Sequence, residues 1–186
     1  MDALELLVGR ESAVKLTSPG PDQTELERMF QSALRAPDHG RLRPWRFVVI
    51  PEGRREEFGE LMADCLHRTD PGASADALQR ERDKALRAPV IVVAAATIHR
   101  GHKIPDVEQL VSAAAAAENI MLAARAQGYG AMWKTGAPAY DAKVKRAFGL
   151  DPDNEIVGFL YLGTQVGAGS PAARPQVNDL VSIWQG

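Results

Sequence analysis

The chain has 186 residues, of which 45% are hydrophobic and 25% are charged, a composition typical of one globular domain. Its 22 Lys and Arg residues nearly balance 24 Asp and Glu residues, so the net charge of −2 gives no basic field for nucleic acid. No apolar run reaches the roughly 18 residues of a membrane span, and a single cysteine, Cys65, excludes an intrachain disulfide. The amino terminus lacks a basic signal-peptide start, so we expect a cytoplasmic protein without nucleic-acid or membrane partners.

Helices alternate with apolar strands along the chain. The predicted helices cover residues 2–8, 24–36, two stretches within 54–88 that are broken at 70–72, 106–128 and 142–148. The predicted strands are residues 46–50, 90–96, 129–133 and 156–162. A capping box from Thr24 to Glu27 begins the second helix, and Pro37 ends it. The alternation predicts an α/β or α+β domain.

We assign residues 1–163 to a single domain and residues 164–186 to an extended tail rich in Gly, Ser, Pro and Ala. The tail ends in an apolar cluster that includes Trp184, and such a cluster is expected to dock on a partner subunit. In the long helix, Ala113–Ala117 would let another helix approach closely, although alanine is also simply a good helix former.

The motifs of several enzyme classes are missing. The sequence has no dinucleotide-binding G-x-G-x-x-G after a strand, no P-loop, no H-E-x-x-H and no G-x-S-x-G. His99 and His102 lie three residues apart, but Arg100 and Lys103 would repel a cation, so we expect no metal site. Cys65 has no visible activating partner and is expected to be a small buried residue rather than a nucleophile.

Two cationic segments could bind an anionic, planar ligand. Arg10 and Ser12 place a guanidinium and a hydroxyl two residues apart, a combination that can hold a phosphate. Residues 35–46 then carry several arginines and a histidine in a loop that leads through Trp45 into a buried strand. Taken alone, each segment is explained equally well as solvated surface chain, with Trp45 as a core anchor.

Four segments, in order along nearly the whole chain, resemble the FMN-dependent nitroreductase family. They are R-x-S at 10–12, R-A-P at 35–37 followed by P-W-R-F-V-V-I at 44–50, the Ala-rich helix ending in A-Q-G-Y-G at 126–130, and G-F-L-Y-L-G-T at 158–164. The R-A-P-D-H loop and the segment Trp133–Gly136 are most similar to the small YdjA-type subgroup of that family.

The resemblance implies an α+β fold, an α/β/α sandwich with a central, mainly antiparallel sheet that forms an intertwined homodimer. Two FMN molecules would lie at the subunit interface. The implied activity is that of an NAD(P)H oxidoreductase, in which NADH or NADPH gives a hydride to flavin N5. Two electrons then pass to a nitroaromatic, a quinone or a similar planar oxidant. Because the flavin carries the chemistry, no catalytic side chain is expected.

The resemblance also implies roles for individual residues. The positions matching cofactor contacts are Arg10, Glu11 and Ser12 at the phosphate and ribityl chain, Arg35 and His39 from the opposite subunit, and Trp133, Lys134 and Thr135 beside the isoalloxazine. The positions matching a nicotinamide dinucleotide site are Ala123, Ala124, Arg125, Ala126, Gln127 and Gly128. Lys134 or Arg10 would bring positive charge near flavin N1 and O2.

One departure from the family pattern bears on flavin binding. Glu11 stands where a second basic residue is usual, which weakens the positive field around a phosphate. Lys15 or Arg174 could supply the missing charge. Two alternatives therefore remain beside the enzyme: a non-catalytic FMN storage or sensor protein, and a relative that has lost the flavin.

Overall fold

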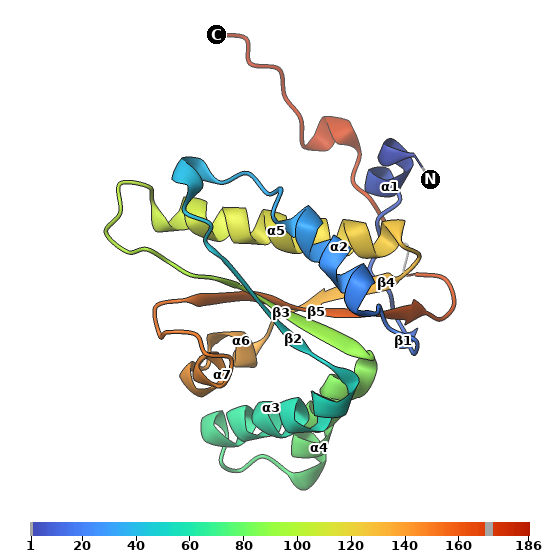
Figure 1. Cartoon of the computed structure of the whole chain (residues 1–186), viewed down its shortest axis with the longest axis vertical. Helices are drawn as coiled ribbons and strands as arrows, with labels where there is room; N and C mark the ends of the chain where they lie inside the picture. The colour runs from blue at the N-terminus through green and yellow to red at the C-terminus, as the bar shows by residue number, and fades with distance from the viewer. Residues whose placement is uncertain (1, 170–172) are drawn as a thin grey trace.

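A five-stranded antiparallel sheet separates two layers of helices (Figure 1). The computed structural model describes residues 2–169 and 173–186. The strands are β1 (Leu16–Thr17), β2 (Trp45–Ile50), β3 (Val90–Ala96), β4 (Gly130–Lys134) and β5 (Glu155–Gln165). The α-helices are α1 (Ala3–Val8), α2 (Gln23–Ala33), α3 (Arg55–Thr69), α4 (Ala75–Lys84), α5 (Asp106–Ala126), α6 (Ala137–Tyr140) and α7 (Ala142–Ala147). Short 3₁₀ turns are η1 (His39–Arg41), η2 (Glu52–Arg54), η3 (Ala85–Arg87) and η4 (Val177–Asp179).

Strand β5 pairs with three other strands of the sheet. It pairs with β3 from Glu155 to Leu162, with β4 from Phe159 to Gly163, and with β1 at Thr164 and Gln165. Strand β2 pairs with β3 and forms an outer edge of the sheet within the described residues. All seven residues of β3 are buried, which confirms the prediction of a central strand covered on both faces.

Helices α2 and α5 cover one face of the sheet (Figure 1). Ala116, Ala117, Ile120 and Ala124 of α5 are fully buried in this layer, together with Met29 of α2. Three of the four buried α5 residues are alanines, so the helix backbone lies close to the sheet and the layer is filled without large side chains.

Helices α3, α4, α6 and α7 lie over the opposite face (Figure 1). Its core is aromatic: the rings of Phe58 and Phe159 have centroids 5.3 Å apart, and Phe148 packs beside both. These helices are shorter than α5, and they leave part of the sheet near β1, β4 and β5 without a covering helix.

The predicted elements are present, with three differences. The capping box of α2 is formed by Asp22 and Glu25 rather than by Thr24 and Glu27, because the Asp22 carboxylate accepts the Glu25 N–H at 2.8 Å. This helix ends at Ala33, earlier than the Pro37 rule predicted. The short elements β1 and α6 were not predicted, since neither is long enough to show a periodic pattern.

Candidate functional site

The α3/α4 side of the sheet contains two adjoining cavities of about 540 and 310 Å³. Arg87, Lys134 and Tyr161 line both, and we call the pair the double cavity. The larger part is also lined by residues 13–16, and the smaller part by residues of α3, α4 and the segment 135–138. Each volume lies in or near the range of small-molecule sites, about 300–1,000 Å³.

The segment after Ser12 forms one wall of the larger part because two strands hold its backbone. The Ala13 N–H donates to the Ala131 carbonyl of β4 at 2.9 Å, and the Lys15 carbonyl accepts the Val166 N–H at 3.0 Å. Ser12 is exposed immediately before this wall. The predicted phosphate-binding triplet therefore adjoins the double cavity.

Two arginines meet at this triplet. Arg174 of the tail donates to the backbone carbonyl of Arg10 at 2.6 Å, and Arg10 Nε lies 3.4 Å from Glu118 Oε1 of α5. Burial raises the pKa of Glu118, and the Arg10 charge partly opposes this rise. The structure thus brings Arg174, one of the two residues considered as a source of extra charge, to the predicted phosphate site. Lys15, the other, lines the larger part of the double cavity.

The Glu11 carboxylate binds the segment that follows β5. Its Oε1 accepts the Gly169 N–H at 3.2 Å and the Gln165 side-chain amide at 3.3 Å. A side chain at Gly169 would collide with this carboxylate. Glu11 therefore anchors the segment leading toward Arg174, and the sequence alone gave no sign of this role.

The end of β4 supplies the opposite wall. Lys134 lines both parts of the double cavity, and Thr135 lines the smaller part. The indole of Trp133 packs instead in the α2/α5 layer and donates to the Val157 carbonyl at 3.1 Å. Since side chains alternate along a strand, Trp133 can offer only its backbone to a ligand in the double cavity.

Arg35 and His39 lie elsewhere in the same chain. Both are exposed, and His39 Nδ1 lies 2.6 Å from Glu108 Oε2 of α5. His39 lines a separate, shallow groove of about 300 Å³ with Val107 and Val111 of α5. The structure of one chain therefore does not bring Arg35 and His39 to Arg10 and Lys134.

The segment 123–128 ends α5 and packs against neighbouring helices. Ala124 is fully buried, and the Gln127 side chain donates to the Glu25 carbonyl of α2 at 3.3 Å. Arg125 lies against Gly9 at the end of α1. None of these six residues lines the double cavity or the groove beside His39. Ala123 and Ala124 share the α2/α5 core layer with the predicted flavin residue Trp133, but the segment does not reach Lys134 or Thr135 in the walls of the double cavity.

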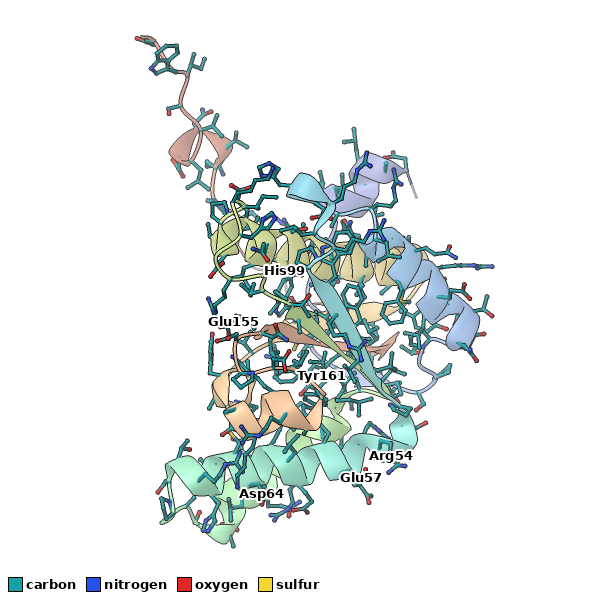
Figure 2. All side chains as sticks on the ribbon, turned by 60° about the vertical axis from the view of Figure 1, so that its left-hand side comes forward. Arg54, Glu57, Asp64, His99, Glu155 and Tyr161 are labelled. Carbon is teal, nitrogen blue, oxygen red and sulfur yellow. The ribbon has the colours of Figure 1, made fainter. Side chains whose placement is uncertain are left out.

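Tyr161 and Arg87 line both parts of the double cavity, and neither was predicted from the sequence. Tyr161 belongs to the apolar run of β5, and Arg87 precedes β3 at the end of a charged helix. Burial raises the pKa of Tyr161 to about 12; the nearby Arg87 charge opposes this rise and Glu81 adds to it. Figure 2 shows Tyr161 on the side of the sheet that faces α3. Only the pairing of β5 with β4 and the position of η3 bring these groups together.

The histidines and the cysteine considered for metal or thiol chemistry make contacts within the fold. Within the described ranges no group of three or more His, Cys, Asp and Glu residues could hold a metal ion. His102 Nδ1 accepts the Ile104 N–H at 3.1 Å, and the Gln109 side chain accepts the His99 N–H at 2.8 Å. Burial first, and then the Asp141 charge, raises the pKa of the Cys65 thiol. Among the described helices, none is both long and apolar enough to cross a membrane.

A protein-family model and a curated relative both match this chain, and both are named as nitroreductases. The model of the Nitroreductase family matches residues 7–164. The Escherichia coli (strain K12) protein named "Putative NAD(P)H nitroreductase YdjA" is 40% identical over 164 residues, which cover 88% of each chain.

Solved structures share the fold. A nitroreductase-like family protein from Bacillus cereus matches 100% of this chain and 97% of its own, with a TM-score of 0.88 and 22% identity. The FMN and NADPH-dependent nitroreductase NfnB from Sphigopyxis sp. strain HMH matches all of both chains, with a TM-score of 0.78 and 21% identity. These likenesses confirm the predicted α+β sandwich with its antiparallel sheet.

Proposed function

The chain belongs to the nitroreductase family, and from this premise we propose that it is an FMN-dependent NAD(P)H oxidoreductase that reduces a nitroaromatic, a quinone or a similar planar acceptor. The names of its relatives support NAD(P)H as the reductant and FMN as the cofactor. In this chain, the double cavity beside the Arg10–Ser12 triplet carries the proposal.

The lining of the double cavity fits a planar ring system with a polar edge. Leu16 and Met132 contribute apolar surface to the larger part. Lys15, Arg87 and Lys134 contribute positive charge, and within the described ranges none of the three forms an ion pair. Apolar walls with a few convergent polar groups are typical of cofactor sites, so we take the residues present to fit FMN.

The phosphate would bind at the mouth of the larger part. Arg10 and Arg174 are close enough for one to donate to the carbonyl of the other, and Ser12 adds a short donor two residues away. Guanidinium groups bind phosphate through several parallel hydrogen bonds. Because Glu11 anchors the segment leading toward Arg174, we infer that it supports phosphate binding indirectly, rather than weakening it.

When bound, FMN supplies the redox chemistry by accepting a hydride from NAD(P)H and passing two electrons to the acceptor. The protein's own contribution is binding and electrostatics. Lys134 and Arg87 bring positive charge into the double cavity, which stabilises negative charge on a bound ring. Thr135 and the backbone at the end of β4 complete the wall. Water can supply protons, so the proposal requires no catalytic acid or base.

We further propose that the active form is an intertwined homodimer. Apolar side chains are exposed on α1 (Leu4, Leu7, Val8), on α5 (Val107, Leu110, Val111) and on the tail (Leu180, Ile183, Trp184). Figure 1 shows the tail extending away from the body of the molecule. Exposed apolar surface of this kind is typical of subunit interfaces. A second copy would also bring Arg35 and His39 to the flavin, which a single chain does not do.

A visible spectrum of the purified protein, recorded before and after anaerobic addition of NADH or NADPH, tests the proposal. We expect a flavin spectrum that bleaches with at least one nicotinamide and recovers with a nitroaromatic or a quinone. A bound flavin that stays oxidised would favour the storage or sensor alternative. A protein that is purified without flavin and does not bind added FMN would show that the family fold is retained without its cofactor.

A further inference from the structure

Tyr161 lies where the two parts of the double cavity meet. Its side chain is 5% exposed and lines both parts. It stands on β5 opposite Met132 of β4, and both side chains pack on the α3/α4 face. Within residues 2–169 and 173–186 its hydroxyl has no hydrogen-bond partner, whereas the hydroxyl of Tyr129 donates to Glu25 at 2.7 Å.

The Tyr161 side chain is buried, but its hydroxyl is not among the buried polar atoms that lack a partner, so we infer that the hydroxyl keeps access to the double cavity. A hydroxyl that is open to a cavity and free of protein partners is available to a ligand in that cavity. Phenylalanine would fill the same space with no polar atom to satisfy. Because burial keeps this hydroxyl protonated, its unused capacity is that of a hydrogen-bond donor, and the matching ligand atom is an acceptor.

The charges around the hydroxyl narrow the choice of ligand. Arg87 and Glu81 both influence the Tyr161 hydroxyl, and both line the smaller part of the double cavity. Lys84 forms an ion pair with Glu81 through both carboxylate oxygens, at 2.5 and 2.6 Å. Donors on Tyr161 and Arg87 beside an acceptor on Glu81 form a mixed set. A simple anion such as phosphate has no donor for Glu81, whereas a cyclic imide offers two acceptor oxygens around one N–H donor.

We propose that Tyr161, with Arg87 and Glu81, binds the dioxopyrimidine edge of the flavin ring. That edge carries the alternating acceptor, donor and acceptor atoms of an imide, and the dimethylbenzene end of the ring carries none. This inference rests on the proposed function, and it assigns to the cofactor three residues that the sequence analysis did not select. Tyr161 and Arg87 supply donors to the ring oxygens, and Glu81 accepts the imide N–H.

The first test removes one oxygen atom. FMN is titrated into flavin-stripped, full-length Tyr161→Phe protein, and binding is followed by quenching of flavin fluorescence. Loss of one hydrogen bond, about 1 kcal/mol, predicts a dissociation constant raised about fivefold. The chain offers two matched controls: Tyr140→Phe on exposed α6 and Tyr129→Phe beside α2 should leave the constant within twofold.

The second test uses the ligand. In 2-thio-FMN a sulfur atom, a weaker acceptor, replaces one ring oxygen. If the Tyr161 hydroxyl or Arg87 donates to that oxygen, the Tyr161→Phe or Arg87→Gln change weakens FMN binding more than 2-thio-FMN binding. Arg87→Gln, at an exposed position, should also lower the midpoint potential of bound FMN. If the variant loses affinity for reduced FMN tenfold more than for oxidised FMN, the midpoint potential falls by about 30 mV.

The outcomes separate this inference from the function on which it rests. Unchanged FMN affinity in a folded Tyr161→Phe protein, together with an unchanged potential in Arg87→Gln, overturns the assignment of these residues and leaves the enzyme proposal intact. A wild-type protein that binds no FMN overturns both.

Discussion

The two faces of the sheet are built differently. The α2/α5 face is filled by small side chains, and Ala116, Ala117 and Ile120 leave no exposed surface. The opposite face is covered by shorter helices and contains the double cavity around Tyr161. The filled face contributes packing to stability. On the hollow face, the side chains of Arg87, Lys134 and Tyr161 form no hydrogen bond or ion pair within residues 2–169 and 173–186. We therefore predict that mutations on the α2/α5 face mainly lower stability, and that mutations around the double cavity mainly weaken ligand binding.

The largest effect is expected from Ile120→Ala on the filled face. Ile120 is fully buried, and truncating such a residue costs about 3–4 kcal/mol of unfolding free energy because a cavity remains. Met62→Ala on the hollow face should cost about 2 kcal/mol, since Met62 already borders open volume. Urea unfolding of both proteins measures the difference. Equal losses would show that the two faces do not differ in packing.

Gly158→Ala tests whether the filled face has room for one carbon atom. A Cβ at Gly158 would collide with the Trp133 indole, so the variant should lose about 2 kcal/mol of unfolding free energy. Gly53→Ala is the matched control, because no atom lies within 4 Å of its added Cβ and its stability should change by less than about 0.5 kcal/mol. Thermal unfolding of the two variants measures the difference. An unchanged stability of Gly158→Ala would contradict the conclusion that the α2/α5 face is tightly packed.

The filled face could be predicted from the sequence far better than the hollow one. A continuous apolar run in residues 90–96 indicates a strand covered on both sides, and the alanine-rich pattern from Asp106 indicates the long helix. These signals are local and periodic. The cap at Asp22 was misplaced because Thr24 offers an equally good local pattern, and only the hydrogen bonds distinguish the two.

The double cavity could be predicted only in part. The resemblance selected Ser12, Lys134 and Thr135, which lie at or in its walls. Tyr161 reaches the cavity through the pairing of β5 with β4, and Arg87 through the position of η3 before β3. No local sequence pattern records either arrangement. A tyrosine within an apolar strand is usually a core residue, and its unpartnered hydroxyl is visible only in the structure.

Arg10→Ala should show the opposite pattern to Ile120→Ala. Loss of a charge-assisted contact to phosphate should weaken FMN binding by about 2 kcal/mol. The unfolding free energy of the flavin-free protein should hardly change, because the Arg10–Glu118 pair is partly exposed and such pairs contribute little. Titration with FMN measures the effect. Arg54→Ala, which removes an exposed pair with Glu57, is the control, and equal FMN affinity in both variants would exclude a phosphate role for Arg10.

The smallest effects come from two tyrosines, one on each face. The pKa of both is raised to about 12, that of Tyr129 mainly by its hydrogen bond to Glu25 and that of Tyr161 mainly by burial. Tyr129→Phe should lower the stability of the flavin-free protein by about 1 kcal/mol at pH 8, because a hydrogen bond is lost. Tyr161→Phe should leave it unchanged or raise it, because only an unpartnered hydroxyl is removed.

The pH dependence of the Tyr129 effect follows from the direction of its shift. The folded state holds the Tyr129 proton more tightly than the unfolded chain, whose tyrosines titrate near pH 10. Its contribution is therefore complete below pH 10 and is lost as the pH rises toward 12. Urea unfolding of wild type and Tyr129→Phe at pH 8 and pH 11 should show the difference between them narrowing. A difference that grows with pH would mean that the Glu25 contact does not hold this proton, and the contrast between the two tyrosines would then have another origin.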